Sequence, residues 1–479
     1  MGSIRLRGAW AMYAAAGAVV VAGLVVLNMP ARLPRAPEAL RGTQRAASAP
    51  PPGRPVNPLG VNLSTDTGAF RGFGELAFVT GGRTGALYVL SGKGVRRVAS
   101  AASQPAWSPD GRWLAFLQGD STTAPTVRIL ESNGHDAHSA IPGAVVALGF
   151  GFSGFAWSPK ADVLALAKPI PVGGLWAVPA SGSPARQLAA TGTQVGSLAW
   201  SPDGRQIAYN VTLPSHHPIT RSDALYTVSA TGGRPVRRFV AKAAGIVVAG
   251  WWPDGKGLLF WTDPQHSASL AADGLTLYSL PLAGGAPRPL TTTLPYPDWV
   301  VSSQRSVLLV SGAGRIVWYQ KTVSACAPAS GVCHPLPLAP GTVSLDPAWS
   351  PRTGQLAYVR ALSRGDTWTW GSCPACTAAA VQQTVAARSM AAWLRTRTLW
   401  VASPSGGGAR EVRQAGVGVY APMWSRGGHH LLYVRDNALW LVNVRGGAPV
   451  RLAGPLLPQW APFGYYGRMG WSQMLAWYR

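Results

Sequence analysis

The sequence is poor in acidic residues and in cysteine. Its 479 residues include 18 Asp and Glu against 42 Lys and Arg, and only 4 Cys. Because several carboxylates stand in turns (Asp110, Asp203 and Asp254), few remain for a glycosidase that works through a carboxylate pair. A Gly-x-Ser-x-Gly nucleophile elbow is also missing. These absences predict a chain that has no catalytic residues, no cofactor and no metal site.

A repeated motif is the strongest feature that is present. A small residue and Trp precede a turn of the Ser-Pro-Asp-Gly kind and then an apolar strand, as in AWSPDGRWLAF from Ala106. The copies that carry this tryptophan have it at Trp107, Trp157, Trp200, Trp251, Trp349 and Trp424. A degraded copy, WVVSSQRSVLLV, has Val300 where the tryptophan is expected. A period of about 40 to 50 residues, made of strands and turns, is typical of β-propeller blades.

Each repeat continues with an alternating strand, a Gly-rich turn and a basic strand, for example ALYTVSATGGRPVRRFVA from Ala224. The unit therefore predicts a four-stranded blade, with Pro and Gly supplying the backbone angles of the first turn. Counting a weaker first unit before residue 100 favours eight blades, and seven stay open if that unit and the C-terminal tail form one blade. We expect the tail, which ends in LAWYR, to close the ring against the first blade, because an unpaired edge strand invites aggregation.

These motifs resemble the WD-like repeat of TolB and of the propeller domains attached to some prolyl peptidases. The resemblance covers residues 68–479 and implies an all-β propeller. It does not choose among binding scaffolds, gating domains of peptidases and sensor modules, all of which use this fold. The sequence departs from TolB because it has no separate amino-terminal α/β domain and has more repeats than the six blades of TolB.

The amino-terminal residues set the expected compartment. The stretch from Ala9 to Met29 is uncharged, mostly apolar and long enough to span a bilayer. No clean small-x-small cleavage site follows it, which favours one retained transmembrane helix at 1–29 over a cleaved signal peptide. Residues 30–67 are rich in Pro, Ala and Arg and predict a stalk, leaving 68–479 for the propeller. The predicted localisation is a membrane-anchored propeller outside the cytoplasm.

The cysteines fall into two pairs, Cys326 with Cys333 and Cys373 with Cys376, in segments expected to be surface loops. Paired cysteines beyond an export segment favour disulfides. The alternative is a redox or metal pair in Cys373-Pro-Ala-Cys376. A zinc site needs four ligands, and the spacing of Cys326 and Cys333 is not that of a zinc knuckle. We therefore predict disulfides.

The formal net charge of the chain is +24. The arginines are spread over all predicted blades, many of them in outer strands, where charge blocks edge-to-edge pairing. Recognition of a nucleic acid requires a more concentrated basic site, so we expect no nucleic-acid partner. Binding to anionic lipid head groups or to an acidic envelope polymer needs only a diffuse positive potential. Either is therefore a better candidate partner than a nucleic acid, and a protein partner is the other candidate.

The long insertions all fall between the predicted second and third strands of a blade, which places them on one face of the propeller. The longest, Ala361 to Arg397, contains Trp368, Trp370 and Trp393. Loops on a rigid scaffold often carry the binding function, and clustered aromatic residues contribute strongly at interfaces. We predict these three tryptophans as anchors of a binding face.

The sequence thus predicts a non-catalytic, membrane-tethered scaffold that binds a protein or ligand on its loop-rich face. One alternative is a propeller enzyme, hydrolase or lyase, with its site at the central channel, and another is a sensory ectodomain. Converging His, Asp or Glu at the mouth of the channel would favour the enzyme, whereas aromatic and backbone groups there would favour the scaffold.

Overall fold

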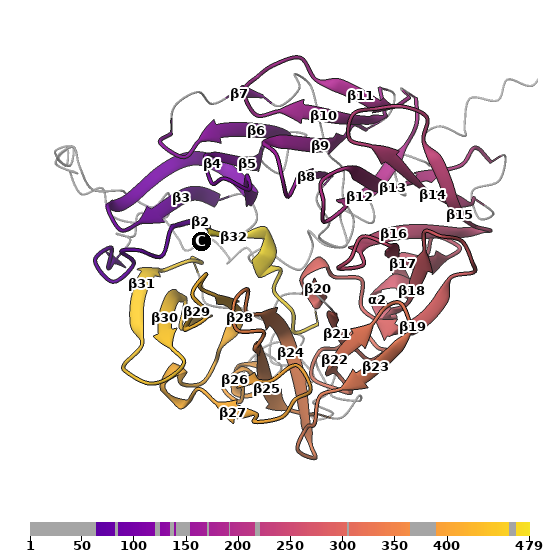
Figure 1. The fold of residues 1–479 in the computed structure, drawn as a ribbon. Helices are drawn as coiled ribbons and strands as arrows, with labels where there is room; N and C mark the ends of the chain where they lie inside the picture. Colours follow the sequence, from indigo (N-terminus) through magenta and orange to yellow (C-terminus); the bar gives the residue numbers. More distant parts are fainter. Residues whose placement is uncertain are drawn as a thin grey trace, which may run out of the picture. The chain divides into compact units, whose positions relative to one another are not determined.

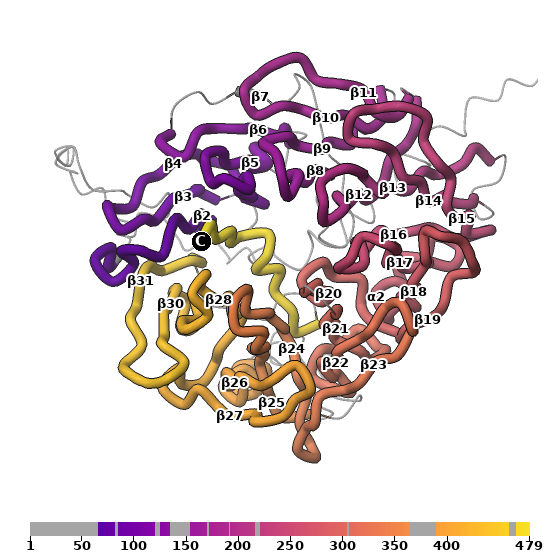
Figure 2. Tube along the Cα trace, viewed as in Figure 1, coloured from indigo at the N-terminus to yellow at the C-terminus, as the bar shows by residue number. Residues whose placement is uncertain are grey.

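The computed structural model describes residues 64–81, 85–119, 125–134, 138–139, 154–169, 172–190, 192–215, 221–303, 306–364, 389–458 and 466–479. All of these residues lie in one compact unit, Pro55–Arg479. Their strands form seven hydrogen-bonded sheets that follow one another around a ring (Figures 1 and 2). The all-β propeller fold is therefore confirmed.

Five of these sheets have four antiparallel strands in chain order. The first two sheets are β8 (Phe155–Trp157), β9 (Val163–Ala167), β10 (Leu175–Pro179) and β11 (Arg186–Ala189), and then β12 (Val195–Trp200), β13 (Gln206–Thr212), β14 (Asp223–Ser229) and β15 (Val236–Ala241). The third sheet is β16 (Ala244–Trp251), β17 (Gly257–Pro264), β18 (Leu275–Pro281) and β19 (Arg288–Thr293). The last two are β20 (Val300–Ser302), β21 (Val307–Ser311), β22 (Thr322–Ala327) and β23 (Val332–Pro335), and then β24 (Thr342–Trp349), β25 (Leu356–Leu362), β26 (Thr398–Ala402) and β27 (Arg410–Glu411).

The two remaining sheets contain the ends of the described chain. A five-stranded sheet joins β28 (Tyr420–Trp424), β29 (His430–Arg435), β30 (Ala438–Asn443) and β31 (Val450–Gly454) to β1 (Ser64–Thr65). A seven-stranded sheet has the order β32 (Leu475–Tyr478), β2 (Glu75–Thr80), β3 (Gly85–Ser91), β4 (Gly94–Trp107), β5 (Trp113–Gln118), β6 (Thr126–Glu131) and β7 (His138–Ser139). Because β1 pairs with β31, the last residues of the predicted stalk belong to the propeller.

The number of blades differs from the favoured prediction. The propeller has seven sheets, and the largest of them holds two repeat units. The long strand β4 pairs with β3 through its first half and with β5 through its second half, so the first two units share one continuous strand. Eight repeat units therefore form seven blades, and the alternative count of seven describes the structure.

The ring closes as predicted. Strand β32, from the C-terminal tail, pairs antiparallel with β2, and Glu75 lies opposite Tyr478. Trp107 reinforces the closure, because its Nε1–H donates to the carbonyl of Ala476 at 3.0 Å. The two ends of the described chain therefore lie in neighbouring strands of one blade.

The repeat tryptophans link successive units around the ring. In every repeat tryptophan except Trp349, the indole N–H donates to the carbonyl of the residue that precedes the corresponding tryptophan of the neighbouring unit. Besides the bond from Trp107 to Ala476, the pairs are Trp157 with Ala106 (2.9 Å), Trp200 with Ala156 (2.9 Å), Trp251 with Ala199 (3.0 Å) and Trp424 with Ala348 (3.2 Å). We call this set of bonds the indole ladder. It satisfies buried polar groups at the seams between sheets, where an unpaired N–H or carbonyl would be costly.

The second strands form the core. The apolar residue seven positions after each repeat tryptophan is completely buried, as the alternation of the repeat requires. These residues are Leu114, Leu164, Ile207, Leu258, Leu356 and Leu431, each with 0% exposure. They pack against side chains of neighbouring sheets, so the core is a series of layers between blades and not a single central cluster.

Several arginines of the outer strands also connect neighbouring units. Arg186 Nη1 donates to the carbonyl of Thr231 at 2.9 Å, and Arg288 Nη1 donates to that of Ala329 at 3.1 Å. Arg96 makes the same kind of bond to the carbonyl of Ser132. Part of the arginine excess therefore has a structural role, since each of these side chains bonds to a turn of the next unit.

Short helices interrupt the strands. They include α2 (Ala268–Asp273), η3 (Pro297–Trp299), η4 (Arg413–Ala415) and η5 (Trp471–Gln473), and residues 389–394 are also helical. Among the described residues, none of the helices combines the length and apolar character needed to cross a membrane. The predicted anchor from Ala9 to Met29 lies outside the described residues, so the anchor and the extracytoplasmic localisation stay predictions.

Candidate functional site

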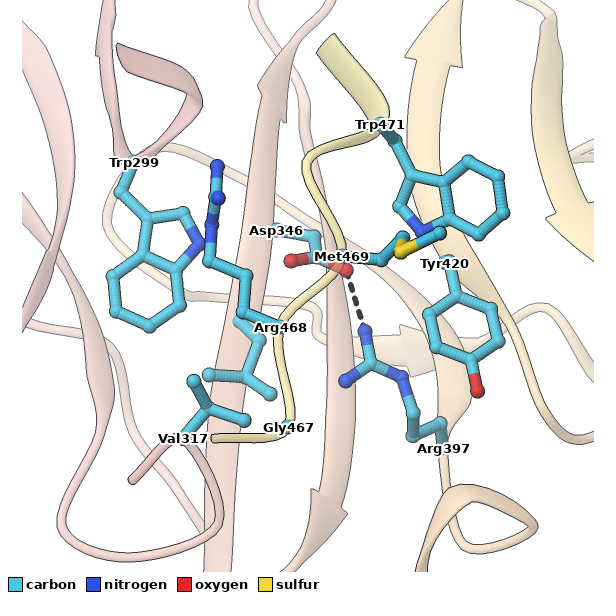
Figure 3. Close-up of a pocket in the computed structure, with 10 residues that line it drawn as sticks. Trp299, Val317, Asp346, Arg397, Tyr420, Gly467, Arg468, Met469 and Trp471 are labelled. Carbon is cyan, nitrogen blue, oxygen red and sulfur yellow. Dashed lines mark hydrogen bonds and ion pairs between the residues drawn. The ribbon is translucent and has the colours of Figure 1, made fainter. Parts of the chain in front are cut away.

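The described residues enclose a cavity beside the β20–β23 sheet (Figure 3). The cavity is small and partly open to solvent: its volume is about 10 Å³, which is room for about one water molecule. One wall is the C-terminal segment, which we define as residues 466–471 and which crosses the middle of the ring on its way to β32 (Figure 1). The lining residues are Trp299, Val317, Leu345, Asp346, Arg397, Tyr420, Gly467, Arg468, Met469 and Trp471.

Asp346 reaches the cavity from a bulge in β24. The pairing of β24 with β25 shifts between Leu345 and Ala348, and Asp346 has a φ of 50° at this point. The first strands of other units bulge at the same place, three residues before the tryptophan, at Gln104 (φ 53°) and Ala421 (φ 45°). A bulge re-aims a side chain. The repeat geometry therefore re-aims the side chain at this position, and the residue type decides which chemical group each unit places there.

Arg397 is the partner of Asp346. Its Nη2 lies 2.5 Å from Asp346 Oδ2, and its Nε donates to the carbonyl of Val419 at 2.9 Å. Only 3% of the Arg397 side chain is exposed, and its guanidinium carbon lies 4.3 Å from the ring centroid of Tyr420. Burial raises the pKa of Tyr420, which keeps its hydroxyl protonated at neutral pH. The first charged group of the cavity is thus a deeply buried ion pair stacked on an aromatic ring.

Arg468, from the C-terminal segment, forms a second ion pair with Asp298 of η3. The guanidinium carbon of Arg468 also lies 3.8 Å from the ring centroid of Tyr296 and 6.0 Å from that of Trp299. Both distances are within the range of cation–π attraction. One carboxylate and two aromatic rings from the β19–β20 connection therefore surround the positive charge of Arg468.

The C-terminal segment fits against the cavity wall because position 467 is glycine. The N–H of Val317 donates to the carbonyl of Tyr466 at 3.2 Å. A Cβ at Gly467 would lie 2.6 Å from Val317 Cγ2 and 2.9 Å from a ring carbon of Trp318, and the φ of Gly467 is 92°. Figure 3 shows the segment passing between Trp299 and Tyr420. The site is therefore already packed around a length of polypeptide backbone.

This arrangement offers binding groups and, among the described residues, no serine or cysteine nucleophile. Its carboxylates can accept bonds from amines, guanidinium groups or backbone N–H groups, and its aromatic rings can pack against side chains. None of the described residues that line it is Ser, Cys or His. In the described part of the chain, no group of three or more His, Cys, Asp or Glu is placed to hold a metal ion.

Trp393, the one predicted binding-face tryptophan among the described residues, does not line this cavity. Trp393 is fully buried, its ring centroid lies 5.9 Å from that of Trp318, and its Nε1–H donates to the carbonyl of Leu362 at 2.7 Å. It therefore contributes to the interior and not to an exposed surface of the described protein. Trp368 and Trp370 lie outside the described residues, and their role stays a prediction.

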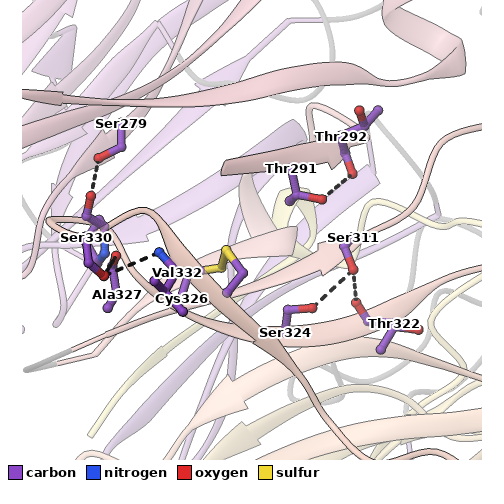
Figure 4. The surroundings of a disulfide bond; sticks show 12 residues. Ser279, Thr291, Thr292, Ser311, Thr322, Ser324, Cys326, Ala327, Ser330 and Val332 are labelled. Carbon is purple, nitrogen blue, oxygen red and sulfur yellow. Dashed lines mark hydrogen bonds between the residues drawn. A yellow bond between two sulfur atoms is a disulfide. The ribbon is translucent and has the colours of Figure 1, made fainter. Parts of the chain in front are cut away.

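One predicted disulfide is present. Cys326 and Cys333 are bonded and their Cα atoms are 4.0 Å apart (Figure 4). They are opposite residues of β22 and β23, so the expectation that they lie in a loop is wrong. The turn between these strands is tied to the neighbouring sheet, since the hydroxyl of Ser279 donates to the carbonyl of Pro328 at 2.6 Å. Cys373 and Cys376 lie outside the described residues.

Sequence reasoning missed the charged residues that line the cavity, Asp346, Arg397 and Arg468, and it missed Asp298, the ion-pair partner of Arg468. Two signals point to them in retrospect. Asp298 and Trp299 directly precede Val300, in the one copy of the repeat that lost its tryptophan. Asp346 is the only carboxylate among the residues three positions before a repeat tryptophan. The departures from the repeat, more than the repeat itself, mark the site.

Comparisons with known proteins support the fold. The solved structures that resemble the chain include dipeptidyl peptidase 4 from Porphyromonas gingivalis, with 10% identity, a TM-score of 0.53, and 82% of this chain and 59% of that chain covered. TolB from Acinetobacter baumannii has 14% identity and a TM-score of 0.34, with 70% and 62% covered. Oligogalacturonate lyase from Vibrio parahaemolyticus has 11% identity and a TM-score of 0.42, with 79% and 97% covered. No family model matches the chain, and no curated protein matches its sequence.

These findings correct the functional prediction. The expected non-catalytic scaffold is overturned, because the peptidase, whose fold is similar over 82% of this chain, is an enzyme. The sequence-based criterion assigned carboxylates at such a site to an enzyme, and Asp346 lines the cavity, while Asp298 lies beside it as the ion-pair partner of Arg468. At such low identity the likeness establishes the fold alone. The chain also spans only about three-fifths of the length of the peptidase, so the activity is taken up below as a proposal.

Proposed function

We propose that the chain is a propeller enzyme of the peptidase type and that the cavity beside the β20–β23 sheet binds its peptide substrate. The observation that carries the proposal is that this cavity already packs against polypeptide, the C-terminal segment. That segment is held by a backbone hydrogen bond from Val317, by the carboxylate of Asp298 and by aromatic rings. A site that accommodates one backbone in this way has the groups needed to accommodate another.

The position of the cavity also supports the proposal. Its walls come from the first strands β24 and β28 and from η3, all on the inner side of the blades. Rigid strands hold Asp346 and Tyr420 in place, and a preorganised site loses little freedom when it binds a ligand. The lining residues supply substrate binding, and the bond-breaking group of the enzyme is not among them. The fold similarity to dipeptidyl peptidase 4 is consistent with this assignment.

Mass-spectrometric profiling of peptide-library cleavage by the full chain tests the proposal. We expect cleavage, and we expect Asp298→Asn to lower kcat/KM by at least about tenfold, since it removes a charged contact to the bound peptide. The matched control is Asp254→Asn, in an exposed turn where Asp254 Oδ1 accepts a bond from the Lys256 N–H at 3.0 Å. Absence of any cleavage would refute the enzyme assignment, and equal effects of the two substitutions would remove the cavity from it.

A further inference from the structure

We propose that Tyr296, Asp298 and Trp299 form a receptor site for the arginine side chain of a peptide ligand, and that Arg468 occupies this site as an internal substitute. The three residues stand at the connection between β19 and β20, where the repeat has lost its tryptophan. This inference names the ligand class of the cavity and rests on the proposed function for its biological meaning. Its chemistry can be tested separately.

The three residues have complementary properties for a guanidinium group. Asp298 supplies the negative charge, and the ring of Tyr296 lies 3.8 Å from the guanidinium carbon of Arg468. The rings of Tyr296 and Trp299 are nearly perpendicular, with an interplanar angle of 89° and centroids 5.3 Å apart, so they form two walls of a corner. A planar, weakly hydrated cation that stacks on rings and pairs with a carboxylate is the group that fits such a corner best.

Arg468 does not use all of the hydrogen-bonding capacity of this site. Its Nη2 bonds to Asp298 Oδ1, but its Nε is buried without a hydrogen-bond partner among the described residues. A carboxylate can accept two parallel bonds from one guanidinium, and the bidentate geometry is the stronger one. The Asp298 side chain is 30% exposed, so it remains accessible from the solvent side. An arginine delivered by a separate peptide can therefore compete for the same carboxylate.

Displacement of Arg468 by an arginine of the ligand would also change the cavity. Four of its lining residues, Gly467, Arg468, Met469 and Trp471, belong to the C-terminal segment. If a ligand displaced Arg468, the segment would lose its ion pair, and the space that it fills would become available to the ligand. The tethered Arg468 acts at a high effective concentration, which for a short tether is about millimolar. The native chain should therefore bind an external arginine peptide weakly, and removal of Arg468 should expose the full affinity.

The experiment uses the full chain, the variant Arg468→Ala, and the synthetic peptide Tyr-Gly-Arg-Met-Gly-Trp with both ends blocked. A second peptide has citrulline, a neutral isostere, in place of arginine. We expect calorimetry to show that Arg468→Ala binds the arginine peptide at least about tenfold more tightly than the native chain does, and more tightly than it binds the citrulline peptide. Adding Asp298→Asn to Arg468→Ala should abolish the difference between the two peptides. Equal binding of both peptides, or equal binding by native chain and variant, would overturn the proposal.

A second measurement covers the case in which Arg468→Ala does not fold. Hydrogen exchange of the native chain, with and without Asp298→Asn, reports whether Asp298 holds the C-terminal segment. We expect faster exchange in residues 466–471 of Asp298→Asn and no change there in Asp254→Asn, and unchanged exchange in both would refute the proposal. The two proposals fail differently: selective peptide binding without cleavage would sink the enzyme assignment alone, whereas cleavage without arginine selectivity would sink only the receptor site.

Discussion

The β12–β15 and β20–β23 sheets show two uses of the same repeat. In the first sheet, Trp200 donates to Ala156 of the preceding sheet, and Ala199 accepts from Trp251 of the following one. In the second, Val300 has no indole to donate, and the Nε1 of Trp349 in the next sheet is buried without a hydrogen-bond partner in the described residues. The indole ladder is therefore complete on both sides of β12–β15 and interrupted on both sides of β20–β23.

The difference teaches where a repeat protein can place a site. At an intact seam, the tryptophan fills the space between the first strands, and the polar backbone groups are satisfied by the ladder. At the interrupted seams, the C-terminal segment enters instead, and the charged groups Asp298, Asp346 and Arg397 meet around it. Loss of the consensus residue thus coincides with the appearance of a cavity, and at this place ion pairs stand where the bonds of the indole ladder are missing.

The largest expected effect concerns the buried ion pair of the cavity. Asp346→Asn keeps the shape of the side chain but leaves the guanidinium of Arg397, whose side chain is 3% exposed, without a counter-charge. Removal of one partner from a buried pair costs about 3 to 5 kcal/mol. Urea denaturation should therefore show a reduction of this size in the free energy of unfolding.

The matched control is an ion pair in a regular unit. Arg112 and Glu131 are 2.9 Å apart, but 63% of the Arg112 side chain is exposed, so water and salt screen the pair. Glu131→Gln should therefore have a much smaller effect than Asp346→Asn. Similar losses for the two variants would show that the interrupted region does not depend on its ion pairs more than the regular blades do.

The sequence predicted the fold far better than the site, and particular residues explain why. The period of Trp107, Trp157 and Trp200 determines strand order, because each strand pairs with the next one along the chain. The site depends instead on contacts that only ring closure creates, such as Arg468 with Asp298, which are separated by 170 residues. No periodic pattern encodes such a pair.

Two of the misjudged features also have local causes. Trp393 was expected at a binding surface because it stands in an insertion, yet residues 389–394 form a helix whose Trp393 packs into the core beside Trp318. The blade count was misjudged because β4 continues from Gly94 to Trp107 in spite of the positive φ angles of Ala101 and Gln104, so two units share this strand. Both features depend on tertiary packing, which overrides local pattern.

The second prediction concerns Lys321, which is 1% exposed and stands directly before β22 in the interrupted region. Its Nζ donates to the carbonyls of Ala313 at 2.7 Å and Tyr319 at 3.2 Å. Burial lowers the pKa of Lys321 from 10.5 to about 8. Between these two values the unfolded chain binds more protons than the folded one, so this residue makes stability rise with pH from about 8 to 10.5, by up to about 3 kcal/mol.

Denaturation across this pH range checks the effect. The rise should be smaller in Lys321→Met than in the native chain, because the substitution removes the titrating group. Lys256→Met is the control, since Lys256 is exposed in a turn of a regular unit, and it should leave the pH dependence as it is. The same pH dependence in Lys321→Met and the native chain would mean that Lys321 is not the group responsible.

The smallest expected effect tests the indole ladder itself. W200F and W349F remove the same atoms from two half-buried tryptophans at equivalent positions, so the loss of apolar contact is similar in both. Only W200F also breaks a hydrogen bond, the one from Trp200 Nε1 to Ala156 at 2.9 Å, because Trp349 Nε1 has no such partner in the described residues. A buried bond of this kind contributes about 1 kcal/mol. W200F should therefore lower the free energy of unfolding by about that much more than W349F does, as measured by urea denaturation of the two variants side by side. If W349F lowers the free energy of unfolding as much as W200F does, packing around Trp349 compensates for its missing hydrogen bond. The indole ladder would then make no measurable difference between the two sheets.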